Sequence, residues 1–280
     1  LGPLHPDTLN SVSNLGNIRQ NQSRHEEAAA LYKRAYEGLN QVVGNRSRDT
    51  LTSLSNYANA LRALRRYEES EAVYLKSIEL KKAALGPAHG ETLRTQLSLC
   101  TLYRYMNRFS EAEAQCRDTY EERKAQAGPE HPSVLMTAQS LGDLLADGGK
   151  LAEAERVLSD LVQTYTRTQG AESNQTLTAK TSLAWCLIRQ RQYGPAREIL
   201  QEVRAARLAG KAPKWTLPYS EAMLGAALAG QEGKGEGEQM MNRALDQLRV
   251  KSLPIPREAW LRAVLLANEF HISYPALQDR

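Results

Sequence analysis

The chain has 280 residues, of which 41% are hydrophobic and 24% charged, so its composition is that of a folded globular protein and excludes an intrinsically disordered chain. Its formal charge of +4, from 36 basic and 32 acidic residues, is too small an excess for a dedicated nucleic-acid-binding protein. The three cysteines, Cys100, Cys116 and Cys186, lack C-x-x-C spacing, which argues against a zinc site or a disulfide framework. With no apolar run near the ~20 residues of a membrane span, we expect a cytoplasmic protein that contacts no membrane.

A fixed interval of 42 residues organises the chain from its first residues onward. The openings LGPLHPDTL, LGPAHGETL and AGPEHPSVL begin the first, third and fourth units, and the second and fifth openings are looser variants. One glycine and one leucine recur at this interval in all five units, namely Gly2, Gly44, Gly86, Gly128 and Gly170, and Leu9, Leu51, Leu93, Leu135 and Leu177. Such regular self-similarity predicts a repeat architecture.

Each unit reads as two helices. In the first unit, apolar residues follow helical spacing from Leu9, the segment NQSR interrupts them, and a second run continues from Ala28 to Leu39. Pro6 and Pro132 suit the first turn of a helix, and Gly86 and Gly128 suit its end. Small residues recur where the two helices must approach, at Gly16, Ala58, Cys100, Gly142 and Ala184 and at Ala28, Ser70, Ala112, Ala154 and Ala196. The second helix is preceded by a turn marked by His25, Tyr67, Phe109, Leu151 and Tyr193.

The end of the chain departs from the strict interval. Tyr219, Leu224, Gly225 and Leu228 restore a first helix with one residue fewer than the interval requires, and Met240 to Leu245 supply its partner. After Pro254 and Pro256, the stretch EAWLRAVLLANEF predicts one more amphipathic helix, with Trp260, Leu261, Val264 and Leu265 facing inward. We expect this helix to cap the array, because a stack of repeats exposes an apolar face at each end.

The pattern L-G-x-x-x-x-x-x-x-R-(aromatic)-x-E-A resembles the tetratricopeptide repeat, and units of 42 residues are similar to the subfamily found in kinesin light chains. The resemblance implies an all-α fold, a right-handed α-solenoid of about six helix pairs plus a C-terminal capping helix. We expect the array to cover residues 1–250, with units near 1–42, 43–84, 85–126, 127–168, 169–210 and 211–250, and the cap and tail to cover 251–280.

Polar and aromatic side chains at outward-facing positions of the first helices form the predicted binding surface. Asparagine side chains hydrogen-bond an extended peptide backbone, and arginines pair with carboxylates. The resemblance implies a protein or peptide partner, with an acidic or aromatic-acidic segment. The predicted peptide-binding residues are Asn14, Asn17, Asn56, Asn59, Arg62, Arg94, Arg104, Tyr105, Trp185 and Arg189. An ordinary solvated helical surface is the other reading, and for Trp185 it is packing against the next repeat.

Other features favour plain structural roles. His5, His89 and His131 occur one per unit, as helix-start residues rather than metal ligands, and the run GQEGKGEGE is a flexible turn rather than a phosphate-binding loop. We find no catalytic motif, and we expect no enzymatic activity, no cofactor and no bound metal. Self-association is not indicated.

The favoured function is a protein-interaction scaffold. The alternative is a regulatory or ligand-sensing array of a larger signalling protein, a kinase or NTPase, that acts on its own upstream domain. This alternative is motivated by the start of the chain at Leu1 inside a motif, which reads as an excerpt.

Overall fold

The computed structural model describes all residues except 1, 211–212, 234, 251–254 and 272–280, and the residues it describes form thirteen helices and no strand. None of these helices has the length and apolar character needed to cross a bilayer. The first seven are α1 (Pro6–Asn21), α2 (His25–Val43), α3 (Arg48–Ala63), α4 (Tyr67–Leu85), α5 (Gly90–Tyr105), α6 (Phe109–Ala127) and α7 (Pro132–Asp147). The remaining six are α8 (Leu151–Gln169), α9 (Asn174–Arg189), α10 (Tyr193–Ala209), α11 (Thr216–Glu232), α12 (Gly235–Leu248) and α13 (Arg257–Glu269).

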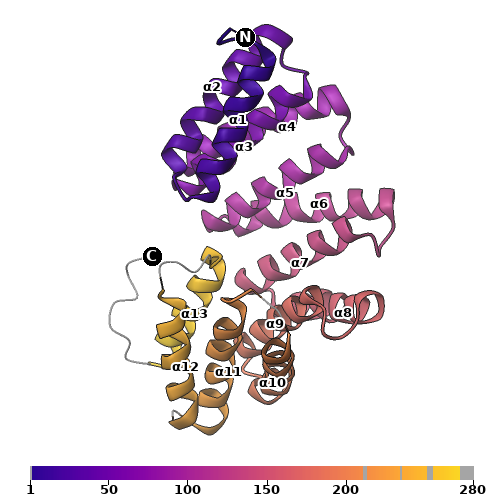
Figure 1. Cartoon of the computed structure of the whole chain (residues 1–280). Helices are drawn as coiled ribbons and strands as arrows, with labels where there is room; N and C mark the ends of the chain where they lie inside the picture. The colour runs from indigo at the N-terminus through magenta and orange to yellow at the C-terminus, as the bar shows by residue number, and fades with distance from the viewer. Residues whose placement is uncertain (1, 211–212, 234, 251–254, 272–280) are drawn as a thin grey trace. The chain divides into compact units, whose positions relative to one another are not determined.

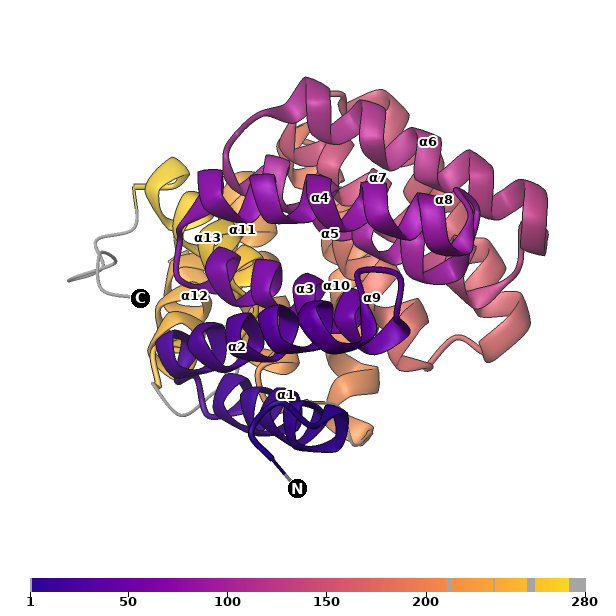
Figure 2. The ribbon, with the colours of Figure 1, turned by 90° about the horizontal axis from the view of Figure 1, so that it is seen from above.

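Two compact units divide the chain, residues 1–144 and residues 145–280, and the boundary falls within α7. In unit 1 the pairs α1–α2, α2–α3, α3–α4, α4–α5 and α5–α6 are in contact, and Figure 1 shows the helices as successive antiparallel pairs. Figure 2 shows α2, α4 and α6 following one another across unit 1. In unit 2 the pairs α8–α9, α9–α10, α10–α11 and α11–α12 are in contact, and α13 packs on α11 and α12.

The helix bounds reproduce the 42-residue interval of the sequence. The first helices α1, α3, α5, α7 and α9 each have 16 residues and start 42 residues apart, and the second helices α2, α4, α6 and α8 each have 19. The residues predicted to mark the turn before the second helix are instead the first residues of that helix, from His25 in α2 to Tyr193 in α10. The all-helical array of about six pairs and a capping helix is therefore confirmed.

The repeated opening motif ends one helix and starts the next. Gly86 caps α4 with a φ of 99°, a conformation that favours glycine. The buried hydroxyl of Thr92 donates to the Gly86 carbonyl oxygen at 2.9 Å, and Thr50 and Thr176 do the same for Gly44 and Gly170. These bonds satisfy carbonyl groups that the end of a helix leaves unpaired.

The recurring histidines cap helices, as predicted for helix-start residues. The Nδ1 atoms of His5, His89 and His131 each accept a hydrogen bond at 3.2 Å from the backbone N–H two residues further on. His5 is the N-cap of α1 and His89 the N-cap of α5. Since an N-cap acceptor satisfies an orphan donor of the first turn, the spacing of one histidine per unit has a structural cause.

Small residues and leucines form the core of each repeat, as the sequence predicted. The five leucines of the opening motif are 1–5% exposed, and the small residues of the second helices, Ala28, Ser70, Ala112, Ala154 and Ala196, are all fully buried. In the first repeat a Cβ atom added to Gly16 would lie 2.7 Å from the ring of Tyr32 in the facing helix. The two helices of a pair therefore approach too closely for larger side chains at these positions.

The last pair, α11 and α12, packs even more closely and corrects one prediction. The glycine-rich run was expected to be a flexible turn between two helices. The change from α11 to α12 does fall within it, between Glu232 and Gly235, but Gly237 lies inside α12 and is buried. A Cβ atom at Gly237 would lie 2.5 Å from both the backbone nitrogen of Ala229 and the carbonyl oxygen of Gly225. Glycine is thus required here by backbone contact between two helices.

The capping helix α13 forms, but its buried face differs from the predicted one. Trp260 is buried as expected, whereas Leu261 and Leu265 are 47% and 45% exposed and Val264 is half-buried. The prediction failed because it chose the large apolar residues. The buried face of the helix instead includes small residues and one arginine, namely Ala259, Trp260, Arg262, Ala263, Leu266 and Ala267.

The contact at Gly237 can be tested with a matched glycine. We expect Gly237→Ala to lower the free energy of unfolding by about 1–3 kcal/mol, because the added methyl group meets backbone that cannot move aside. Gly235→Ala in the same helix meets nothing within 4 Å and should be neutral or stabilising by up to about 1 kcal/mol through helix propensity. Urea denaturation of the full chain measures both, and equal effects of the two changes would contradict the close contact.

Candidate peptide-binding site

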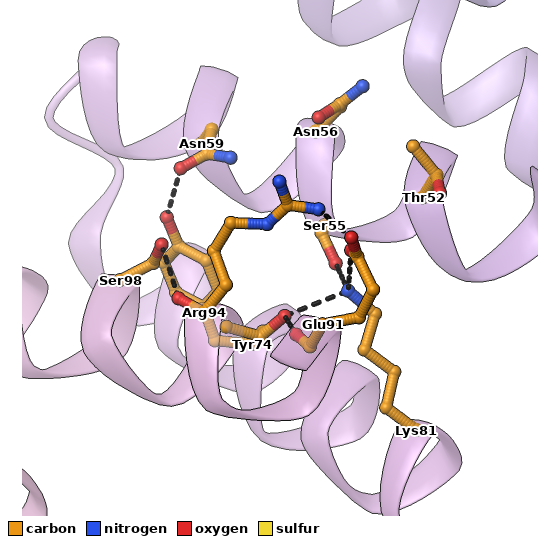
Figure 3. A pocket seen from close by; sticks show the side chains of 10 residues that line it. Thr52, Ser55, Asn56, Asn59, Tyr74, Lys81, Glu91, Arg94 and Ser98 are labelled. Atoms are coloured by element: carbon orange, nitrogen blue, oxygen red, sulfur yellow. Dashed lines mark hydrogen bonds and ion pairs between the residues drawn. The ribbon is translucent and has the colours of Figure 1, made fainter. Parts of the chain in front are cut away.

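A polar cavity of about 310 Å³ lies between α3, α4 and α5 in unit 1, and Figure 3 shows the side chains that surround it. Three residues of the predicted binding surface, Asn56, Asn59 and Arg94, contribute to its wall. The full lining is Thr52, Ser55, Asn56, Asn59, Tyr74, Lys81, Glu91, Arg94, Thr95 and Ser98. The structure therefore brings together residues of two successive first helices around one opening, with the second helix α4 behind them.

Asn59 is held in place by a buried tyrosine of the facing helix. The hydroxyl of Tyr74 donates to Asn59 Oδ1 at 2.6 Å, and the same bond at 2.8 Å joins Tyr32 to Asn17 one unit earlier. Burial raises the pKa of Tyr74, while its neighbour Arg62 opposes this shift. The Asn59 side chain is thus fixed before any ligand arrives, which reduces the entropy that binding would cost.

Lys81 of α4 places an ammonium group in the interior of unit 1. Its side chain is only 2% exposed, and its Nζ donates to Ser55 Oγ of α3 and to Thr95 Oγ1 of α5, both at 2.8 Å. Burial lowers the pKa of Lys81 to about 8, and the nearby Glu91 carboxylate partly opposes this effect. Lys81 remains mostly protonated at neutral pH, so the cavity contains a desolvated positive charge.

Glu91 and Arg94 form an ion pair one turn apart on α5 at the edge of the cavity. Glu91 Oε2 also lies 3.8 Å from Lys81 Nζ, so one carboxylate faces two cations. Burial pushes the pKa of Glu91 upward, but the hydrogen bond and the charge of Arg94 hold it below its usual range. Arg94 is 66% exposed while Glu91 is 21% exposed, so the guanidinium faces solvent and the carboxylate faces inward.

A cluster of aromatic rings and arginines lies at the ends of α3 and α5. The guanidinium carbon of Arg62 lies 5.4 Å from the ring centroid of Tyr105, and Tyr105 stacks on Tyr67 at 6.5 Å. Arg104, on the last turn of α5, is half-buried. Two predicted residues, Arg62 and Tyr105, are therefore in direct contact through a cation–π interaction.

The other predicted residues lie elsewhere. Asn14 and Asn17 are exposed on α1 and take no part in the cavity. Trp185 and Arg189 belong to α9 in unit 2, and Trp185 is 1% exposed. Its position in the repeat predicted an outward-facing side chain, so for Trp185 the structure supports the alternative reading, packing within the protein.

Trp185 is buried because two charged residues far away in the sequence surround it. Its Nε1 donates to Asp147 Oδ1 at 3.1 Å, and Arg262 of the capping helix binds the same oxygen through Nη2 at 3.0 Å. The guanidinium carbons of Arg262 and Arg189 lie 5.3 and 5.5 Å from the centroid of the indole ring. A cation–π and hydrogen-bond cluster thus joins the end of α7 to α9 and α13 inside unit 2.

Comparison with protein-family models gives matches to the tetratricopeptide repeat over residues 8–49, 49–125 and 133–209. The chain belongs to the tetratricopeptide repeat family. Proteins built from such repeats are in general protein-interaction scaffolds with extended binding surfaces. A comparison with functionally curated proteins gives no match.

Solved structures similar to this tetratricopeptide repeat protein include two related to kinesin light chains. Nearly identical TPR-like repeats of Podosopora anserina, assigned to a kinesin light chain, are 22% identical, with a TM-score of 0.66, and the match covers 73% of this chain and 97% of theirs. BtubC (BKLC) from P. vanneervenii is 16% identical, with a TM-score of 0.67, over 83% of this chain and 95% of its own. At these identities the likeness establishes the fold alone.

Sequence reasoning missed Lys81, the most buried charge of the cavity. A signal was present, because the same repeat position holds Leu39, Lys81, Arg123, Tyr165 and Arg207, all of them buried. Arg123 and Arg207 also point into the junction with the following first helix, where they donate to Ser133 O at 3.0 Å and to Thr216 O. A repeat position of the second helices that holds apolar residues in some units and cations in others therefore indicates a buried junction between repeats rather than a solvated face.

Replacement of Lys81 should reveal the cost of its burial. We expect Lys81→Leu to raise the free energy of unfolding at pH 7 by about 1–3 kcal/mol, because leucine already fills this position as Leu39 and a desolvated charge is removed. The hydroxyls of Ser55 and Thr95 keep partners, since they donate to the carbonyl oxygens of Leu51 and Glu91.

The stability advantage of Lys81→Leu over the wild type should decline as the pH rises. The pKa of Lys81 is about 8 in the folded state and 10.5 ordinarily, so between these values the unfolded chain binds more protons and the wild type gains stability with pH relative to Lys81→Leu. Two charged groups face Lys81, those of Glu91 and Arg94. Both are present in the wild type and in Lys81→Leu. Urea denaturation at pH 7 and pH 10 measures the free energy of unfolding of both proteins. If the advantage of Lys81→Leu grew with pH, the pKa of Lys81 would not be lowered by burial.

The Asp147 cluster gives a second stability test. Asp147→Ala should lower the free energy of unfolding of unit 2 by about 3 kcal/mol, because it removes a carboxylate that is only 17% exposed from the Arg262 guanidinium and the Trp185 indole. Asp160→Ala, an exposed aspartate of α8, should change it by less than about 0.5 kcal/mol. Thermal unfolding followed by tryptophan fluorescence compares the two variants, and similar midpoints would show that the cluster contributes nothing.

Proposed function

We propose that this chain is a protein-interaction scaffold that binds an extended peptide segment of a partner protein across α3 and α5 of unit 1. The observation that supports this most directly is the convergence of Asn56, Asn59 and Arg94 on one cavity. Amides at regular spacing and a solvent-facing guanidinium are suited to a peptide backbone and its acidic side chains. The scaffold binds and does not catalyse, and its three free, buried cysteines agree with a reducing, cytoplasmic setting.

The binding residues are organised before a ligand arrives. Asn59 is fixed by Tyr74, and Arg62 by its contact with Tyr105. Because Asn59 Oδ1 accepts a hydrogen bond from the Tyr74 hydroxyl, a ligand would meet the Asn59 NH2 group, which donates hydrogen bonds to carbonyl groups. Arg62 and Tyr105 add a flat, partly exposed surface at the end of the same two helices, where an aromatic side chain of the partner would stack. The proposed peptide thus runs from the cavity toward this aromatic cluster.

Selection from a random peptide library on the full chain tests the proposal. We expect selected peptides to bind wild type and to lose about tenfold in affinity with Asn56→Ala, because an interfacial hydrogen bond is removed. Asn14→Ala is the matched control, since Asn14 occupies the same repeat position on α1 outside the cavity. A library that gives no binder, or binders unaffected by Asn56→Ala, would overturn the proposal.

A further inference from the structure

An open groove of about 320 Å³ lies on unit 2 between α10, α11 and α12. Figure 1 shows α11 between the two second helices α10 and α12, and both are in contact with it. The buried side chains of Leu224 and Leu228, one turn apart on α11, form its floor. Ala205 and Leu208 of α10 line one side, and Met240 of α12 lines the other. This α10–α12 groove is therefore apolar at its centre.

The α10 side of the groove differs from the second helices of the earlier repeats. Leu208 is 56% exposed, although the equivalent positions of the earlier repeats hold polar residues. These positions are Asn40, Lys82, Lys124 and Thr166 for Leu208, and Glu37, Glu79, Glu121 and Gln163 for Ala205. Since the repeat forms with polar side chains at both positions, the packing of the helix pair does not require the apolar wall of α10.

The arginines at the rim of the groove are already paired within the protein. Arg204 Nε donates to Glu221 Oε1 at 2.8 Å, and Arg197 forms an ion pair with Glu232. Glu236, at the start of α12, is the remaining charged residue of the lining. Because exposed ion pairs contribute little free energy, the occupant that this groove favours is an apolar side chain rather than an ion.

An apolar ridge of matching size lies on α13. Leu261 and Leu265 are 47% and 45% exposed and lie one turn apart on the same side of this helix. With Leu208, they are three of the four large apolar residues that are exposed among the described residues of unit 2. The buried face of α13, which includes Trp260 and Ala263, is a different one. Packing within the chain therefore does not account for the ridge.

We propose that the ridge of one copy of this chain, Leu261 and Leu265, docks in the α10–α12 groove of a second copy. Residues four apart on a helix form ridges that pack into the grooves of other helices. The spacing of the two ridge leucines equals that of Leu224 and Leu228 on the floor of the groove. The contact removes the ridge and Leu208 from water together, which favours association.

This contact makes the chain self-associate through unit 2. A two-fold dimer forms the contact twice, with each copy giving its ridge to the groove of the other, and leaves no ridge or groove open. The contact is small, so association is weak and reversible. The inference goes beyond peptide binding, because the ridge and the groove share no residue with the proposed site in unit 1.

Sedimentation velocity of the full chain at about 10 to 300 µM tests the proposal, since small interfaces associate in this range. We expect the wild-type mass to rise with concentration above the 31.2 kDa of one chain. Leu208→Glu and Leu265→Glu should each weaken association about tenfold or more, because a carboxylate is buried in an apolar contact. Leu75→Glu is the matched control, since Leu75 of α4 is 48% exposed and lies in unit 1. It should associate like the wild type.

A mixture of the two unit 2 variants identifies the contact. Leu208→Glu keeps an intact ridge and Leu265→Glu keeps an intact groove, so the mixture should associate at concentrations at which each variant alone is monomeric. This recovery also shows that neither variant has lost its fold. The proposal is overturned if the wild type stays monomeric, if Leu75→Glu weakens association as much as the other two changes, or if the mixture stays monomeric.

Discussion

Close packing of two helices through small side chains is the contact on which each repeat depends. Where Ala28 and its equivalents are fully buried, the paired helices approach so closely that their other side chains are directed toward neighbouring pairs. The junction between pairs holds other large residues, including Lys81, whose ammonium bonds both α3 and α5. The cavity of unit 1 lies at this junction, and Lys81 stands there in the place that leucine, tyrosine or arginine takes in the other repeats.

The buried lysine at this junction lowers stability. A buried ammonium with a lowered pKa costs the fold free energy that an apolar residue would not, and it places a positive charge beside Glu91 in the wall of the cavity. Violations of packing and electrostatic rules tend to occur at functional sites. At the Asp147 cluster, by contrast, one carboxylate and the guanidinium groups of Arg262 and Arg189 surround Trp185, and their contacts join α7, α9 and α13 within unit 2.

The fold was predictable because its residues recur in every unit. The site was less predictable because its residues differ from one unit to the next. The five leucines and the small residues were placed correctly because the same sequence pattern recurs every 42 residues. The histidines were assigned to helix starts for the same reason. Trp185 was placed wrongly because its burial is decided by Asp147, 38 residues away in the sequence, and by Arg262, which lies 115 residues beyond Asp147. The outward-facing positions of Arg94, Asn56 and Asn59 followed from helix geometry. The burial of Lys81 did not, because it depends on contacts with Ser55 and Thr95 of two other helices, which the pattern within one helix does not record.

The constant length of the helices also bears on how such a chain tolerates insertions and deletions. Each residue added within a helix rotates all that follows by about 100°, which would turn the Thr92–Gly86 cap and the Lys81 junction away from their partners. A gain or loss of 42 residues returns every side chain to an equivalent neighbour, because contacts in such arrays are made between adjacent repeats. Whole repeats can therefore be duplicated or lost in evolution while the lysine junction, once formed, is transmitted intact.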